Sequence, residues 1–224
     1  MIVTAEKPLE EILKFLAPYH RILVLGCQGC FQPPRGLKEA EAYLPKLEAA
    51  GKATRAATLA RQCDAELISG RLREELGDVE AVLSLACGVG VQMVSAAFPE
   101  IPVFPAQNTM FIGGEGEEGE FLEFCSGCGE CVLERTGGIC PITRCSKSLL
   151  NGPCGGSQGG RCEVDPQLEC AWHLIYERLK ALGRLEALAE IWKVRDWSGS
   201  PSGGPRTIRP SIRPEKRIDL PPLG

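Results

Sequence analysis

Histidine and aromatic residues are scarce in this chain of 224 residues. It holds 2 histidines, and Phe, Trp and Tyr together make up 6% of it. Histidine is the usual co-ligand of cysteine in zinc sites, so two histidines leave room for few mixed Cys–His sites. Few aromatic side chains also leave less bulk for a hydrophobic core. Bound metal could supply part of the stability that such a core lacks.

A strong charge of one sign is also missing. The formal net charge is −4 at pH 7, which gives no electrostatic basis for binding nucleic acid. The longest uncharged stretch, residues 81–99, is nearly long enough to cross a membrane, but Cys87, Gly88 and Gly90 interrupt it. That composition is more typical of a buried strand, a glycine turn and a short helix. We therefore expect neither a nucleic-acid partner nor a membrane span.

The beginning of the chain lacks the features of a secretory signal. Glu6, Glu10 and Glu11 interrupt it, and neither an apolar run nor a small-residue cleavage site follows. We therefore expect a cytoplasmic protein, in which cysteines stay reduced.

Cysteine, in contrast, is abundant: the chain holds 12, and eight of them fall in residues 125–170. These eight are Cys125, Cys128, Cys131, Cys140, Cys145, Cys154, Cys162 and Cys170. They make two sets of four, and four thiolates are what a [4Fe–4S] cluster or a structural zinc ion requires. In a reducing compartment, this close spacing favours metal ligands over disulfides.

Three features favour iron–sulfur clusters over zinc in this segment. Cys125, Cys128 and Cys131, the cysteine triplet, have the spacing that opens the ferredoxin signature, and Cys140-Pro141 resembles its closing Cys-Pro. Histidine is scarce. The glycines that separate the cysteines provide flexible backbone whose N–H groups can bond cluster sulfur.

The ferredoxin analogy also suggests how the cysteines divide between two clusters. In ferredoxins the fourth cysteine of the signature serves the other cluster, so Cys170 would complete the site of the cysteine triplet. The second cluster would be held by the remaining four, Cys140, Cys145, Cys154 and Cys162. Because the gap before Cys140 is longer than in ferredoxins, other divisions stay open, and so does zinc at one of the sites.

Alternating strands and helices predict an α/β fold with a small parallel, Rossmann-like sheet in residues 1–112. Apolar runs predict strands at 21–26, 81–86 and 102–105. Helical patterns fall at 7–19, 37–50, 65–76 and 91–98. Residues 52–60 fit either a further strand or part of a longer helix.

The other four cysteines follow these predicted strands. Cys27 and Cys30 come after the first strand, Cys87 after the strand at 81–86, and Cys63 after 52–60. Loops that follow parallel strands meet at the carboxyl edge of the sheet. We expect a metal site there, which could be a third [4Fe–4S] cluster. Ordinary buried thiols, or a redox dithiol formed by Cys27 and Cys30, are the alternatives.

The second half of the chain is expected to be mostly loop. Glycine and glutamate at 113–120 predict a solvated linker to a ferredoxin-like cysteine module at 121–197. Apolar spacing predicts a long helix over 169–197. Residues 198–224, rich in proline, glycine and arginine, predict an extended tail that docks on a partner.

Residues 125–156 read CSGCGECVLERTGGICPITRCSKSLLNGPCGG. Together with LGCQGC at 25–30, SLACGVGVQ at 84–92 and NTMFIG at 108–113, they resemble the methylenetetrahydrofolate reductase C-terminal domain family. Its best-known members are the MetV-type iron–sulfur and zinc subunits of anaerobic reductases. The resemblance extends over the chain to about residue 195.

The resemblance implies an iron–sulfur electron-transfer subunit without catalytic residues of its own. Electrons would come from ferredoxin or a larger electron-bifurcating complex and pass to the FMN of a MetF-type reductase subunit. That partner would reduce methylene-tetrahydrofolate to methyl-tetrahydrofolate. The alternatives are a zinc-stabilised structural or regulatory subunit of the same reductase, and a subunit of another one-carbon enzyme that uses a corrinoid.

Overall fold

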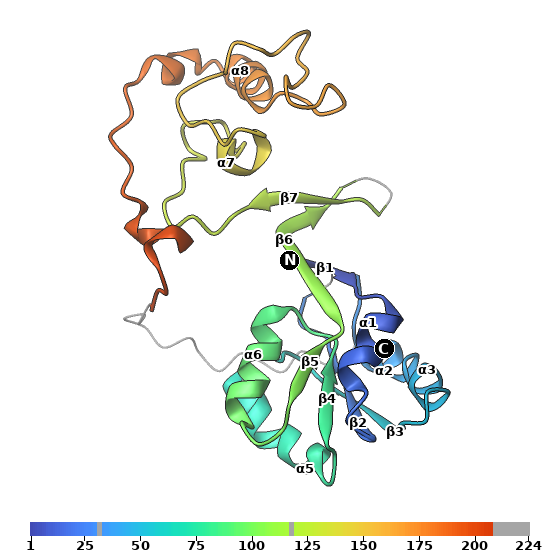
Figure 1. Cartoon of the computed structure of the whole chain (residues 1–224). Helices are drawn as coiled ribbons and strands as arrows, with labels where there is room; N and C mark the ends of the chain where they lie inside the picture. The colour runs from blue at the N-terminus through green and yellow to red at the C-terminus, as the bar shows by residue number, and fades with distance from the viewer. Residues whose placement is uncertain (31–32, 117–118, 208–224) are drawn as a thin grey trace.

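The computed structural model describes residues 1–30, 33–116 and 119–207. The chain forms an α/β lobe and a cysteine-rich lobe, and a small antiparallel sheet lies between them (Figure 1). All twelve cysteines have free thiols. Among the described residues, no helix is long and apolar enough to cross a membrane.

The α/β lobe is built on a parallel sheet of four strands in the order β3-β2-β4-β5. The strands are β2 (Arg21–Cys27), β3 (Ala53–Leu59), β4 (Ala81–Ser84) and β5 (Val103–Pro105). Residues 52–60, which the sequence left undecided, therefore contain a strand, and it pairs with β2 along its whole length. This confirms a mixed α/β fold with a parallel sheet.

Helices cover both faces of this sheet (Figure 1). One face packs against α1 (Leu9–Leu16), α2 (Leu37–Glu41) and α3 (Leu44–Glu48). The other packs against a π-helical turn at Ile68–Leu72, α5 (Arg73–Leu76) and α6 (Gly88–Ala97), and the short helix α4 (Ala65–Leu67) leads into the π-helical turn. Side chains alternate along β2, so Ile22 and Val24 enter the first core while Leu23 and Leu25 enter the second. All four are fully buried, as expected for a strand covered on both sides.

Two predicted helices differ from those observed. The helix expected at 37–50 is divided into α2 and α3, and Pro45 lies in the first turn of α3, where its missing N–H costs nothing. The helix expected from residue 91 begins at Gly88. Cys87 is its N-cap residue, so this cysteine sits where β4 gives way to α6.

A second sheet, of antiparallel strands, was not predicted. Its strands are β1 (Ile2–Glu6), β6 (Gln107–Glu115) and β7 (Phe121–Cys125), in the order β1-β6-β7. The prediction of a linker from residue 113 is therefore wrong for 113–115, which belong to β6. Gly113 is needed there, because a Cβ atom at this position would lie 2.0 Å from the carbonyl oxygen of Leu122 on β7.

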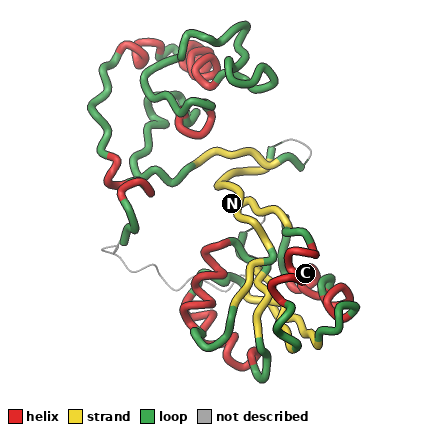
Figure 2. Tube along the Cα trace, viewed as in Figure 1, coloured by secondary structure: helices red, strands yellow, loops and turns green. Residues whose placement is uncertain are grey.

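Loops make up most of the cysteine-rich lobe (Figure 2). Its α-helices are α7 (Pro141–Arg144) and α8 (Ala171–Ala181), and 3-10 turns follow at Leu185–Ala189, Trp197–Gly199 and Pro201–Gly203. The single long helix predicted over 169–197 is wrong: Gly183, with φ of +65°, ends α8 in a left-handed conformation. Trp172, Ile175 and Leu179 of α8 form the small core of this lobe.

Candidate metal-binding sites

The four cysteines of the α/β lobe lie at the carboxyl edge of its parallel sheet. Cys27 ends β2, Cys30 and Cys63 lie in the loops after β2 and β3, and Cys87 precedes α6. From β2 the chain crosses to β3 on one side and then returns to β4 on the other. Open parallel sheets bind ligands at such a reversal of strand order. The structure thus brings these cysteines to the place that the sequence predicted.

The four thiols are close enough for their charges to interact. Burial raises the pKa of Cys27 above its ordinary value, and charges on Cys30 and Cys63 would raise it further. Burial is also the main cause that raises the pKa of Cys63, and charges on Cys30 and Cys87 would raise it further. Such repulsion keeps thiols protonated until a cation neutralises them, and metal binding then releases their protons.

The buried side chain of Gln62 stabilises this edge of the sheet, a role that no sequence pattern indicated. Its side chain is completely buried, and its Nε2 donates hydrogen bonds to the carbonyl oxygens of Leu25 (2.9 Å) and Gly26 (3.0 Å). The backbone N–H groups of Gln62 and Gly29 face the sulfur of Cys27 and partly offset the effect of burial on its pKa. Gln62 therefore holds the loop that carries Cys63 against the end of β2.

In the cysteine-rich lobe, the triplet begins with Cys125 at the end of β7 and continues in a loop shaped by two glycines. Gly127 and Gly129 have φ of +62° and +91°, a conformation that side chains rarely adopt. The Gly127 N–H donates to the sulfur of Cys125 over 3.4 Å. Backbone donors directed at cysteine sulfur are typical of iron–sulfur loops.

The segment after α8 returns to cover this loop. An added Cβ on Gly129 would lie 2.1 Å from the carbonyl oxygen of Gly199, so the two backbones are in close contact. Arg206 donates a 3.2 Å hydrogen bond to the carbonyl oxygen of Gly127. We call residues 190–207 the strap. The first part of the predicted tail thus packs on the chain's own cysteine loop; residues 208–224 lie outside the described residues, and docking on a partner stays a prediction.

Cys154 and Cys162 share one polar cluster. The thiol of Cys154 lies 3.1 Å from a carboxylate oxygen of Glu163, and Lys147 donates to the same oxygen over 2.9 Å. Ser146 lies 3.4 Å from the sulfur of Cys162. That contact is the main reason why the pKa of Cys162 is below its ordinary value, followed by the backbone N–H groups of Asp165 and Val164. Cys162 is therefore suited to bind as a thiolate.

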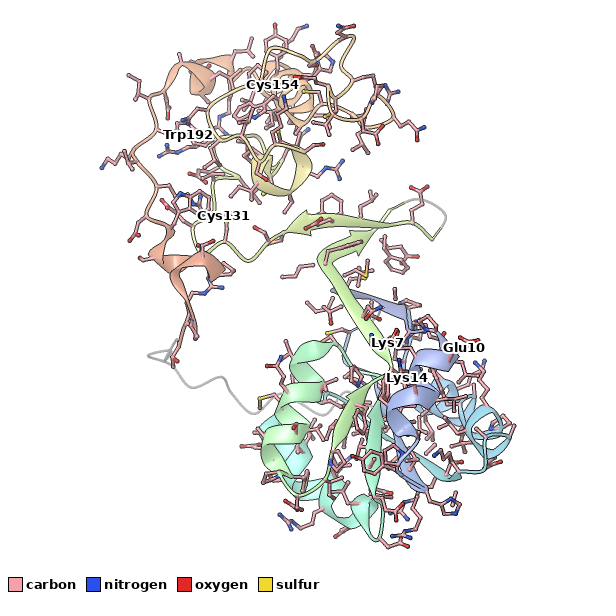
Figure 3. The ribbon with its side chains drawn as sticks, in the orientation of Figure 1. Lys7, Glu10, Lys14, Cys131, Cys154 and Trp192 are labelled. Atoms are coloured by element: carbon pink, nitrogen blue, oxygen red, sulfur yellow. The ribbon has the colours of Figure 1, made fainter. Side chains whose placement is uncertain are left out.

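The remaining cysteines of this lobe lie at helix ends. Cys140 and Cys145 flank α7, and Cys170 precedes α8. Cys145 and Cys170 both pack on the cluster around Ile175, although the ferredoxin analogy assigns them to different sites. Cys131 and Cys154 lie in separate parts of the lobe (Figure 3). The division of the eight cysteines between two sites stays a prediction.

A hollow of about 710 Å³ opens beside α8. Cys170, Trp172, His173 and Trp192 line it, together with the loop around Asn151. The two tryptophan rings lie 6.5 Å apart and make one wall largely apolar. Cys170 is thus the one cysteine of the module that borders this hollow among the residues described.

Within residues 1–30, 33–116 and 119–207, no three His, Cys, Asp or Glu side chains are arranged to hold a metal ion. The chemistry of the donors nevertheless suits one. Thiols gather at the sheet edge with mutual repulsion, and in a glycine-rich loop of the other lobe the Gly127 N–H faces the sulfur of Cys125.

In comparisons with known proteins, the match falls mainly on the cysteine-rich lobe. No curated protein matches the chain. Residues 104–198 match a family model described as "Methylene-tetrahydrofolate reductase C terminal". The match begins in β5, includes all eight cysteines at 125–170 and ends within the turn at Trp197–Gly199; the four cysteines of the sheet edge precede it. Over these residues the chain is similar to the C-terminal region of methylenetetrahydrofolate reductases.

Proposed function

We propose that this chain is the iron–sulfur electron-transfer subunit of a methylenetetrahydrofolate reductase complex. One observation carries the proposal: the segment that matches the reductase family is the one that holds eight cysteines, and backbone N–H groups face the sulfur atoms of two of them, Cys125 and Cys162. Four-thiolate sites of this kind hold [4Fe–4S] clusters. A MetF-type subunit with FMN would receive the electrons and carry the residues that reduce methylene-tetrahydrofolate.

A [4Fe–4S] cluster, when bound, supplies one-electron transfer, and the residues of this chain hold it and adjust its surroundings. Cys125, Cys128 and Cys131 with Cys170 would hold one cluster. Cys140, Cys145, Cys154 and Cys162 would hold the other. Near the latter, Lys147 places a positive charge beside Cys154 and Glu163, which offsets part of the negative charge of a thiolate-bound cluster.

The Rossmann-like lobe would carry a third metal site at Cys27, Cys30, Cys63 and Cys87. The mutual repulsion of these thiols supports this part of the proposal. Either zinc or a further cluster suits four thiolates. We propose a cytoplasmic complex in which ferredoxin or an electron-bifurcating assembly supplies the electrons.

Metal analysis of protein purified without oxygen tests the proposal. Iron, zinc and acid-labile sulfide are measured, and EPR spectra are recorded before and after dithionite. We expect about eight irons per chain with matching sulfide and a signal from reduced clusters, and about twelve irons if the sheet edge holds a third cluster. Zinc with little iron would contradict electron transfer and leave a zinc-stabilised structural or regulatory subunit.

The proposed partner can be tested separately. The chain is mixed with a MetF-type subunit, and the absorbance of FMN is followed after the clusters have been reduced and excess reductant removed. We expect the flavin to be reduced only when the cluster-loaded chain is present. If apoprotein reduces the flavin equally well, the electrons do not pass through clusters of this chain.

A further inference from the structure

We propose that Arg195 is a positioning residue for the metal centre at the cysteine triplet: it donates a hydrogen bond to the sulfur of Cys128 and raises the reduction potential of the bound cluster. The inference rests on the proposed function, since it requires a cluster at Cys125, Cys128 and Cys131. It adds a residue that is not a ligand and that lies 67 positions from Cys128 in the chain.

The guanidinium of Arg195 is directed at the triplet loop. Its Nη2 lies 3.0 Å from the sulfur of Cys128 and 2.6 Å from the carbonyl oxygen of Glu130. It also lies 3.4 Å from the carbonyl oxygen of Cys128. Three acceptors from one loop therefore fix the position of this side chain, and one of them is a proposed metal ligand.

The strap holds the other side of the guanidinium in place. The indole ring of Trp197 faces it, with the guanidinium carbon 4.7 Å from the ring centroid. Arginine on an aromatic face is held by cation–π attraction, and the ring excludes water from one side. Arg195 is thus clamped between the triplet loop and Trp197, so its donors point in fixed directions.

One N–H donor of the Arg195 guanidinium has no acceptor among the described residues. This donor is the buried Nε. A buried N–H without a partner is costly, and arginine cannot relieve that cost by losing its proton. A sulfur atom of a bound cluster would supply the missing acceptor next to the bond that Nη2 already makes to Cys128.

The effect on reduction follows from charge. Reduction adds an electron to a cluster that is already negative, so a nearby cation and N–H donors stabilise the reduced form more than the oxidised form. Hydrogen bonds to charged groups change an equilibrium by roughly tenfold or more. Arg206, the other arginine of the strap that contacts this loop, bonds the Gly127 and Gly199 carbonyl oxygens and not a sulfur.

The test compares Arg195→Gln with Arg184→Gln in full-length protein purified without oxygen. Arg184 is a matched control because it donates to a backbone carbonyl, that of Glu134, in the same lobe over 3.1 Å. Redox titration followed by EPR measures the ratio of reduced to oxidised cluster at fixed potentials. We expect the ratio to fall about tenfold in Arg195→Gln, as for the loss of one charged hydrogen bond, and to stay at the wild-type value in Arg184→Gln.

Arg195→Lys is the second variant, in case Arg195→Gln loses its iron. Wild type and Arg195→Lys are prepared with arginine labelled with ¹⁵N in the guanidinium, and pulsed EPR detects ¹⁵N nuclei that couple to the reduced cluster. We expect a ¹⁵N coupling in wild type that disappears in Arg195→Lys and persists in Arg184→Lys. If Arg195 had a purely structural role, Arg195→Lys and Arg184→Lys would show the same ¹⁵N coupling.

The outcomes separate the inference from the proposed function. Wild type without iron and sulfide overturns both. Clusters with the wild-type ratio in Arg195→Gln, or with no ¹⁵N coupling that depends on Arg195, overturn the role of Arg195 alone.

Discussion

The hydroxyl group of Ser84 donates a 2.6 Å hydrogen bond to the side-chain oxygen of Gln62, and both residues are completely buried. Ser84 ends β4, and Gln62 follows β3, two strands that β2 separates. Since the amide group of Gln62 also reaches the end of β2, one side chain ties together the loops that carry Cys27, Cys63 and Cys87.

Replacing this side chain should weaken the α/β lobe. Gln62→Leu keeps the volume but leaves the Ser84 hydroxyl without its acceptor and the Gly26 carbonyl without the amide donor. We expect the free energy of unfolding to fall by about 3 kcal/mol, as measured by urea denaturation under anaerobic conditions. Gln92→Leu is the control, because among the described residues the side chain of Gln92 bonds only to Gly88 within its own helix, α6, and this variant should stay within about 0.5 kcal/mol of wild type. Equal losses in both variants would contradict the role of Gln62.

Replacing glycine by alanine should have opposite effects on stability at Gly90 and at Gly70. At Gly90 in α6, a Cβ atom would lie 2.6 Å from Cβ of Ala86 and 2.9 Å from Cβ of Gln62, so Gly90→Ala should cost about 1–3 kcal/mol through overpacking. At Gly70, a Cβ would meet no atom within 4 Å among the described residues. Gly70→Ala should therefore be neutral or stabilise by up to about 1 kcal/mol. Thermal unfolding of the two variants side by side distinguishes these effects; destabilisation by both would show that space at Gly90 is not the reason.

Glu80 should make stability depend on acid pH. Its carboxylate accepts hydrogen bonds from the backbone N–H groups of Arg21 (3.0 Å) and His20 (2.6 Å). These bonds hold the pKa of Glu80 below its ordinary value, and the bond from Arg21 has the larger effect. A lowered pKa means that Glu80 contributes stability above the pKa of the unfolded chain and loses it as pH falls through the folded value. Glu80→Gln should therefore flatten the decline of the unfolding midpoint below about pH 4.5.

The control for this prediction is Glu177→Gln, which removes an exposed carboxylate paired with Lys180 on α8. That variant should keep the acid dependence of wild type, because exposed pairs of this kind contribute little. If Glu80→Gln and wild type lose stability in parallel as the pH falls, the two N–H bonds do not govern the acid response.

Cys63 should be required for metal at the sheet edge. Charges on both Cys30 and Cys87 act on its thiol, so it lies near both of these members of the set. We expect Cys63→Ala to lose about one zinc, or about four irons, per chain. The EPR signal of the clusters at 125–170 should persist. Ser69→Ala, in the π-helical turn of the same lobe, serves as the control, and full metal content in Cys63→Ala would exclude this residue as a ligand.

The parallel sheet could be predicted because its strands are local apolar runs. β3 was uncertain, since Ala53–Leu59 contains an arginine and three alanines and has no strong apolar pattern. Its pairing with β2 decides the structure, and Arg55 is accommodated by donating to the carbonyl oxygens of Glu75 and Leu76. The placement of Cys27, Cys30, Cys63 and Cys87 at the carboxyl edge of the sheet could be predicted from this topology alone, and a shared metal site there stays a prediction.

Other features depend on contacts between distant parts of the chain. β1 gains its hydrogen bonds from β6, more than 100 residues later, and its five residues alone carry little signal. Arg195 is likewise one of many arginines in the sequence, and only the fold places it on Cys128. Gly183 was available as a stop for α8, but the apolar spacing that continues beyond it suggested a longer helix.

The pairing of β1 with β6 also has a consequence for how the chain folds during synthesis. Ile2 pairs with Ile112, and every strand of the parallel sheet lies between these two residues in the chain. All strands of the parallel sheet are therefore synthesised before β6, the partner of β1. Until β6 has been synthesised, β1 has no strand to pair with. Contacts that close so large a loop form slowly. The closing of β1 onto β6 should then be a late event, which joins the start of the chain to the hairpin that leads into the cysteine-rich lobe.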